Sequence, residues 1–204
     1  MRKLALFLAI LFVSVLCSAC INNIAIQELN NKAQEYMQKG DIQSAICRLE
    51  SSVDLDGTVF ETRYNLGVAY ISAQDFKKAQ EQLKEAVKIK PDFADSYYSL
   101  AVAQESEGMA LLEEDEDDTS DVVVNVVNED DEFSGLKNIT EDEAIALVTL
   151  LNSAVDSYKK YLELKPQTQD RADVEAQISY LEETALKYAR KYELAESPDN
   201  EGED

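Results

Sequence analysis

Seven residues in the segment 66–91 follow the spacing of a helix-turn-helix repeat, in which small and apolar residues recur on two successive helices. They are Leu66, Gly67, Tyr70, Ala79, Leu83, Ala86 and Pro91. Residues of the same kind stand 34 positions earlier or later: Ala33, Tyr36, Ala45, Leu49, Leu100 and Ala101. Two short helices cannot bury their apolar faces alone, so neighbouring units must stack. The sequence therefore predicts an all-α repeat solenoid.

The same spacing sets the boundaries of the repeats. The closing proline of the third repeat is expected at position 125, but the matching Leu-Lys-Pro segment ends at Pro166. We interpret this offset as an insertion between the two helices of one repeat, because solenoids accept insertions in their loops. The expected repeats are 26–59, 60–93, and 94–112 with 142–168, the last two segments flanking an acidic insertion at 113–141.

A last helix is predicted at 170–192. Val174, Ile178 and Leu181 lie on one face of it, and charged residues lie on the other. One apolar stripe and one polar face are what a terminal capping helix requires. Outside this repeat domain, 26–192, we expect a signal peptide at 1–19, a tether at 20–25 and a disordered acidic tail at 193–204.

The charge of the chain excludes several classes of ligand. It has 41 acidic and 19 basic residues, a net charge of −22, and no histidine. Nucleic acid and anionic membrane surfaces would be repelled. The absence of histidine removes the commonest general base and the commonest zinc ligand. No phosphate-binding loop, nucleophile elbow or EF-hand calcium loop is present. We therefore expect no catalytic residues, no cofactor and no metal site.

The N-terminus has the pattern of an export signal. Arg2 and Lys3 precede an apolar run, Leu4 to Leu16, that is too short to span a membrane comfortably. The segment ending at Cys20 resembles a bacterial lipobox, with Cys17 where that pattern has leucine. The resemblance implies cleavage before Cys20, its lipidation, and anchoring in the cell envelope, by default in the outer membrane facing the periplasm. The alternative is ordinary cleavage after Ala19 and a soluble, exported protein.

Cys47 is the other cysteine of the expected mature chain. With Cys20 lipidated it has no partner for an intramolecular disulfide. It lies among Ala45, Ile46 and Leu49 on a predicted helix. We expect it to be a small buried hydrophobe rather than a reactive thiol.

The repeat residues resemble those of the tetratricopeptide repeat (TPR) family over 26–192. The match is strongest in the second repeat, while the position of the family's tryptophan holds Leu29, Arg63 and Tyr97. The resemblance implies a right-handed superhelix whose first helices line a concave groove. The corresponding groove residues are Gln27, Asn30, Gln34, Met37, Glu61, Tyr64, Val68, Ile71, Asp95, Tyr98, Val102 and Glu105.

None of these groove positions is lysine or arginine, so the carboxylate-clamp mode of the family is not expected. Tyr64 and Tyr98 would lie one repeat apart at an apolar centre. A peptide or protein partner with apolar anchors and basic flanks would complement such a groove. The alternative role of both tyrosines is to pack against neighbouring helices.

The sequence therefore predicts a non-enzymatic scaffold or adaptor lipoprotein of a bacterial envelope. Two other functions stay open at this point. Residues 113–143 contain 14 acidic residues and a single lysine, Lys137, so this segment could itself bind cations or a basic ligand. The repeats could also mediate self-association.

Overall fold

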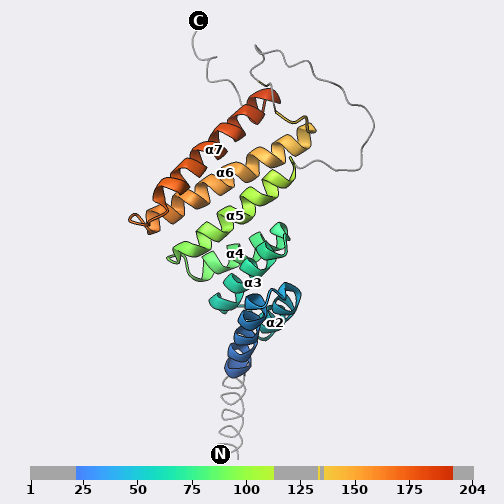
Figure 1. Ribbon diagram of the computed structural model, residues 1–204, viewed down its shortest axis with the longest axis vertical. Coiled ribbons are helices and arrows are strands. Elements are labelled where there is room, and N and C mark those ends of the chain that lie inside the picture. The colour runs from blue at the N-terminus through green and yellow to red at the C-terminus, as the bar shows by residue number, and fades with distance from the viewer. Residues whose placement is uncertain (1–21, 113–132, 134–135, 195–204) are drawn as a thin grey trace, which may run out of the picture. The chain divides into compact units, whose positions relative to one another are not determined.

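The computed structural model describes residues 22–112, 133 and 136–194, and its regular structure within those ranges is helical (Figure 1). A first helix covers 22–38 and so extends into the predicted tether. The helices that follow are α2 (Ile42–Leu55), α3 (Phe60–Ser72), α4 (Phe76–Ile89), α5 (Ala94–Ala110), α6 (Glu141–Leu164) and α7 (Arg171–Lys191).

The chain forms two compact units, Met1–Ser96 and Tyr97–Asp204, which we call unit 1 and unit 2. The boundary falls near the start of α5. The predicted signal peptide, Cys20 and most of the acidic insertion and tail lie outside the described residues. None of the helices in the described ranges is both long and apolar enough to cross a membrane.

Unit 1 repeats one turn geometry at an interval of one repeat. Gly40 and Gln74 both have positive φ, 76° and 60°. The next residue in each case, Asp41 or Asp75, caps the following helix by accepting a hydrogen bond from a backbone N–H three residues on. Gly40 and Asp41 therefore form the turn between the first helix and α2. At Gln74 the chain makes the same turn with a residue that does not favour it.

Close contact between α3 and α4 explains the small residue at position 67. A Cβ atom on Gly67 would lie 2.5 Å from Leu83 Cγ and 3.3 Å from the carbonyl oxygen of Ala79. Leu83 and Ala79 are fully buried. The two helix backbones can therefore approach this closely only because position 67 has no side chain.

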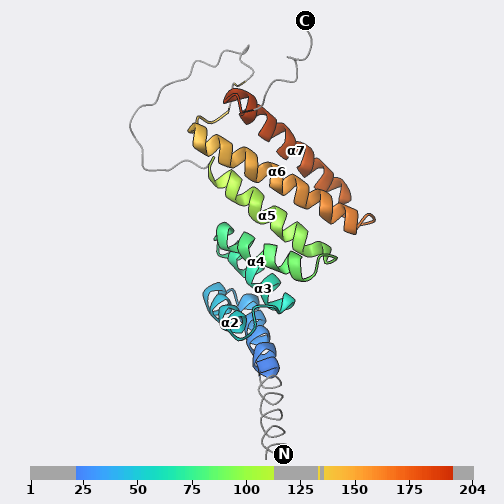
Figure 2. The ribbon, with the colours of Figure 1, turned by 180° about the vertical axis from the view of Figure 1, so that it is seen from behind.

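Unit 2 contains α6, α7 and nearly all of α5, which lie side by side in both views (Figures 1 and 2). α6 begins with a capping box, in which Thr140 and Glu143 bond each other's backbone N–H. The side chains of Gln104 on α5 and Ser157 on α6 hydrogen-bond at 2.8 Å. A Cβ atom on Gly108 would lie 3.2 Å from Leu151 Cδ2. Helices separated by the predicted insertion therefore pack directly on each other.

The segment that leads into α6 is attached to the end of α7. The hydroxyl of Tyr192 accepts a hydrogen bond from the N–H of Ile139 at 3.0 Å and donates one to its carbonyl oxygen at 2.6 Å. Lys191 Nζ donates to Asn138 Oδ1 at 2.8 Å. The two Tyr192 bonds satisfy the backbone groups of Ile139, which lies outside any helix.

The prediction that Cys47 is buried is wrong. Its side chain is exposed, because the buried face of α2 consists of Ala45, Ile46, Leu49 and Ser52, and position 47 lies off that face. Apolar neighbours in the sequence did not reveal its position on the helix.

We predict that Gly67→Ala destabilises the protein. Overpacking in a full core costs about 1–3 kcal/mol, and the better helix propensity of alanine returns at most about 1 kcal/mol. Urea unfolding should give a net loss of about 1–2 kcal/mol. Leu83→Ala should cost less in the Gly67→Ala background than alone, because the added methyl group partly fills the space. Strictly additive losses would contradict the steric explanation.

We also predict that Gln74→Gly stabilises the protein. A non-glycine residue with φ near 60° is strained, and glycine relieves this at the cost of some chain entropy, for a net gain of about 0.5–1 kcal/mol. Gly40→Gln is the reciprocal control and should lower the free energy of unfolding. Nothing lies within 4 Å of a Cβ atom at Gly40, so the effect there is one of backbone conformation alone. If the two variants changed the free energy of unfolding in the same direction, the explanation by backbone strain would be wrong.

Candidate functional site

Three of the predicted groove residues, Tyr98, Val102 and Glu105, line a pocket of about 400 Å³ in unit 2. All three lie on α5, at positions that share one helical face with residue 106. The pocket also includes residues of α6, of α7 and of the turn before α7. We call it the α5–α7 pocket; its other lining residues are Ser106, Tyr158, Asp170, Asp173, Val174 and Gln177.

Aromatic rings form one wall of this pocket. The ring centroid of Tyr98 lies 5.6 Å from that of Tyr158 and 5.2 Å from that of Tyr161. Tyr158 and Tyr161 are buried, but Tyr98 keeps 38% of its surface exposed. Tyr98 therefore both packs on α6 and presents part of its ring to the solvent.

Hydrogen bonds fix the carboxylates of the pocket. Glu105 accepts one from the Tyr158 hydroxyl at 2.8 Å and another from Gln177 Nε2 at 2.5 Å. Asp170 accepts from the Tyr161 hydroxyl at 3.0 Å, and also from the hydroxyl of Thr168. Donors on α6, α7 and the turn between them therefore orient two of the acidic groups.

These surroundings change the pKa values of several groups. Burial raises the pKa of the Tyr158 hydroxyl well above its ordinary range, and the charge of Glu105 raises it further. Burial, followed by the charge of Asp170, also raises the pKa of Tyr98. The hydrogen bond from Thr168 lowers the pKa of Asp170, and the charge of Lys165 contributes to the same shift. At neutral pH the pocket thus combines the neutral hydroxyls of Tyr98 and Tyr158 with the ionised carboxylate of Asp170.

The groove residues of unit 1 have different surroundings. Gln27 and Gln34 are exposed, whereas Val68 and Ile71 are half-buried. The side-chain amide of Asn30 is engaged inside the unit, where Nδ2 donates to Ser52 Oγ at 3.1 Å and to Thr62 Oγ1 at 2.8 Å. These bonds join the first helix to α2 and α3. The Asn30 amide therefore serves the fold.

Tyr64 belongs to an aromatic cluster in unit 1. Its ring centroid lies 6.0 Å from that of Phe60 and 5.4 Å from that of Phe93. Lys90 Nζ lies 5.1 Å from the ring centroids of both phenylalanines. Tyr64 is half-buried and packs against two phenylalanines, so it has a packing role like that of Tyr98.

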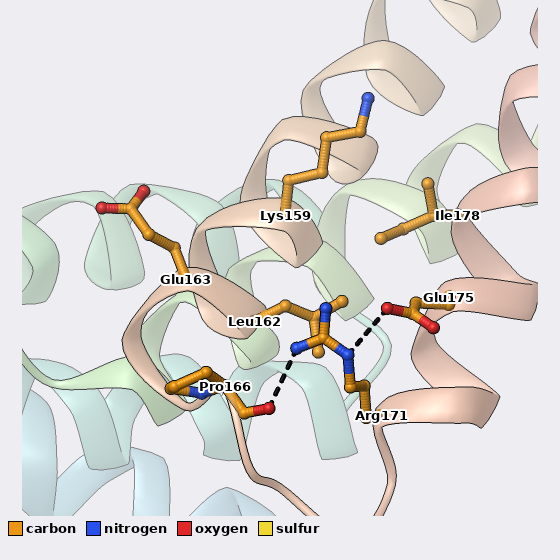
Figure 3. Close-up of a pocket in the computed structure, with 7 residues that line it drawn as sticks. All are labelled: Lys159, Leu162, Glu163, Pro166, Arg171, Glu175 and Ile178. Atoms are coloured by element: carbon orange, nitrogen blue, oxygen red, sulfur yellow. Dashed lines mark hydrogen bonds and ion pairs between the residues drawn. The ribbon is translucent and has the colours of Figure 1, made fainter.

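A second pocket, of about 470 Å³, lies where α6 ends and α7 begins (Figure 3). Leu162 and Ile178 are among its apolar lining residues. Its Arg171 guanidinium donates to the carbonyl oxygen of Pro166 at 3.0 Å and pairs with Glu175 at 2.8 Å. This arginine is therefore already occupied by protein groups. In the part of the chain that the structure describes, no group of three or more His, Cys, Asp or Glu side chains is placed to hold a metal ion.

Sequence reasoning missed the contribution of α7 to the α5–α7 pocket. Asp173, Val174 and Gln177 follow helical spacing, but we treated this helix as a cap with one buried stripe. The spacing of Asp173 and Gln177 beside the buried Val174 is a signal that could have suggested a second contact surface.

A sequence model of the TPR repeat matches residues 69–108. The structure is similar to the second TPR domain of human RPAP3, solved with the HSP70 peptide SGPTIEEVD. The TM-score is 0.54 and the identity 12%, over 79% of this chain and 98% of that one. The chain has the TPR fold. The predicted all-α TPR class is confirmed.

Two further TPR structures are similar to this chain. The first TPR domain of Spaghetti (RPAP3), bound to the HSP90 peptide SRMEEVD, has a TM-score of 0.53 and 16% identity, over 79% of this chain and 93% of that one. The TPR domain of Arabidopsis OM64 has a TM-score of 0.54 and 13% identity, over 78% of this chain and 96% of that one. A comparison with curated proteins finds no match.

We predict that Tyr158 makes the TPR fold sensitive to alkali. The folded state keeps the Tyr158 proton, whereas the unfolded chain loses it above about pH 10. Stability is therefore lost as the pH rises beyond that value, at up to about 1.4 kcal/mol per pH unit from this group. Tyr158→Phe should flatten the decline in urea unfolding between pH 9 and 11. Tyr180→Phe, which removes an exposed hydroxyl on α7, is the control and should leave the slope unchanged.

Proposed function

We propose that this protein is a non-enzymatic interaction module, a TPR scaffold that docks a protein or peptide partner through the exposed surface of its repeat helices. The observation that carries this proposal is the α5–α7 pocket. Tyr98, Val102 and Glu105, which the TPR resemblance assigns to the groove, line a single concave site there. A large, partly exposed tyrosine beside fixed polar groups is typical of binding surfaces.

The chemistry of the pocket favours a partner with apolar anchors and basic flanks. The peptides solved with the RPAP3 domains each carry two glutamates and one aspartate. Among the lining residues of the α5–α7 pocket, three are acidic and none is lysine or arginine. An acidic peptide would be repelled here, whereas a basic one would be attracted and steered to the site.

We further propose that the module is held at a bacterial envelope by a lipid on Cys20. The support is the sequence of residues 1–20, with its basic start, apolar run and small residues before the cysteine. Lipidation would place the protein at the outer membrane, facing the periplasm. Cleavage after Ala19 without lipidation would instead give a soluble exported protein.

The second candidate function resides in the acidic insertion. Its support is charge density, but the structure assigns part of that charge to another role. Glu141, Asp142 and Glu143 form the first turn of α6, where negative charge is favourable at a helix N-terminus. The candidate segment remains 113–143, in which the three acids of this turn also stabilise the start of α6.

The docking proposal predicts that a partner can be captured from native membranes and that its capture depends on Tyr98. We would crosslink and purify the intact chain, Cys20→Ala, Tyr98→Ala and a variant lacking 113–132. Tyr98→Ala should weaken binding of the recovered partner by at least about tenfold, as buried aromatic anchors do. Loss of recovery with Cys20→Ala would support the tether.

Tyr180→Ala is the matched control, because Tyr180 is also an exposed tyrosine of unit 2 but does not line the pocket. Circular dichroism of each variant checks that the fold survives. Equal binding by the Tyr98 and Tyr180 variants would refute docking at this site. Loss of the partner only on deletion of 113–132 would transfer the function to the insertion.

A further inference from the structure

We infer that the α5–α7 pocket is a receptor for one arginine side chain of the partner. The inference rests on the proposed function and specifies its chemistry. A guanidinium needs a flat surface to stack on and carboxylate oxygens in fixed positions. Tyr98 offers the surface, and Glu105 and Asp173 offer the oxygens.

The carboxylate of Glu105 is oriented before any ligand arrives. Its Oε2 accepts from Tyr158 and its Oε1 from Gln177, at 2.8 and 2.5 Å. A carboxylate has about four acceptor positions, so each oxygen keeps capacity for a further donor. A planar guanidinium can donate to both oxygens at once, which an ammonium group cannot do. This geometry favours arginine over lysine.

Tyr98 and the valines provide the apolar part of the site. The Tyr98 ring is held by Tyr158 and Tyr161 and keeps 38% of its surface exposed, so its position is fixed while part of it remains accessible. Val102 and Val174 lie on the two helices that flank the pocket. They suit the methylene stem of an arginine, which buries along apolar surface while its charged end stays polar.

The three acidic residues that line the pocket, Glu105, Asp170 and Asp173, make it anionic. Asp173 is exposed and lies at the start of α7, while Asp170 is occupied by Tyr161 and Thr168. Lys165 is the basic residue whose charge reaches Asp170, and its Nζ lies 5.6 Å from the Tyr161 ring centroid. The carboxylates still outnumber this cation, so a partner's guanidinium would gain attraction on entering.

Methyl NMR on the full chain tests this inference, because Val102 and Val174 report on the pocket directly. The probe is a capped heptapeptide with one arginine between leucines. Matched peptides carry lysine or neutral citrulline at the same position. The arginine peptide should shift both valine signals, and citrulline should bind about tenfold more weakly, as expected for loss of a charge-assisted hydrogen bond.

Three variants localise the effect. Glu105→Gln and Asp173→Asn should each weaken the arginine peptide, the first by about tenfold. Asp156→Asn removes an exposed acid of α6 that does not line the pocket, and it should leave the affinity unchanged. Asp173→Asn removes an exposed charge without disturbing the hydrogen bonds of Glu105. A loss of affinity in this variant therefore cannot be attributed to a change in the structure around Glu105.

Several outcomes would overturn the inference. Equal affinity for the arginine and lysine peptides would refute guanidinium recognition. If Asp156→Asn and Asp173→Asn weakened binding equally, the attraction would come from the net charge of the protein and not from this pocket. Absence of peptide binding would also overturn the inference, while capture of the membrane partner that still requires Tyr98 would leave the proposed function standing. If Tyr98→Ala leaves that capture unchanged, the proposed function itself fails.

Discussion

The structure depends on how closely two helices can pack within a repeat. At Gly67 the α3 backbone lies so near Leu83 that no side chain fits between them, and at Gly108 the α5 backbone approaches Leu151 in a similar way. Such contacts commit one face of each first helix to its partner. On α5, residues beside that contact, Tyr98 and Val102 among them, line the α5–α7 pocket. Packing inside the repeat thus determines which residues can meet a ligand.

Much of this arrangement follows from residue spacing. Gly67 and Ala79, the small residues of the repeat pattern, lie where α3 and α4 approach closely, and Gly40-Asp41 lies directly before α2. The TPR resemblance also selected Tyr98, Val102 and Glu105, because the groove positions of that family can be aligned with this sequence residue by residue. These features are local, so a linear sequence contains them.

Other features depend on which partly exposed residues meet across helices. Gln177 donates a hydrogen bond to Glu105, which lies 72 positions earlier in the sequence, and no local sequence pattern contains that contact. Cys47 illustrates the opposite error, because apolar sequence neighbours suggested burial at a position that the helix turns towards solvent. Asn30 was selected for the groove by its register, yet its amide is bound to Ser52 and Thr62. The position of a residue in the repeat indicates which way its side chain points, but it does not identify the hydrogen-bond partners of that side chain.

The attachment of Ile139 to Tyr192 has a consequence for the order in which unit 2 is built. Repeat folds gain most of their stability from neighbours in the sequence, so they can form progressively from one end. Here the two bonded residues are 53 positions apart, and the later one lies just beyond the last turn of α7. Closing a loop of that length costs entropy before its bonds form. During synthesis α5 and α6 can pair first, but the start of α6 acquires its final contacts only after residue 192 has emerged.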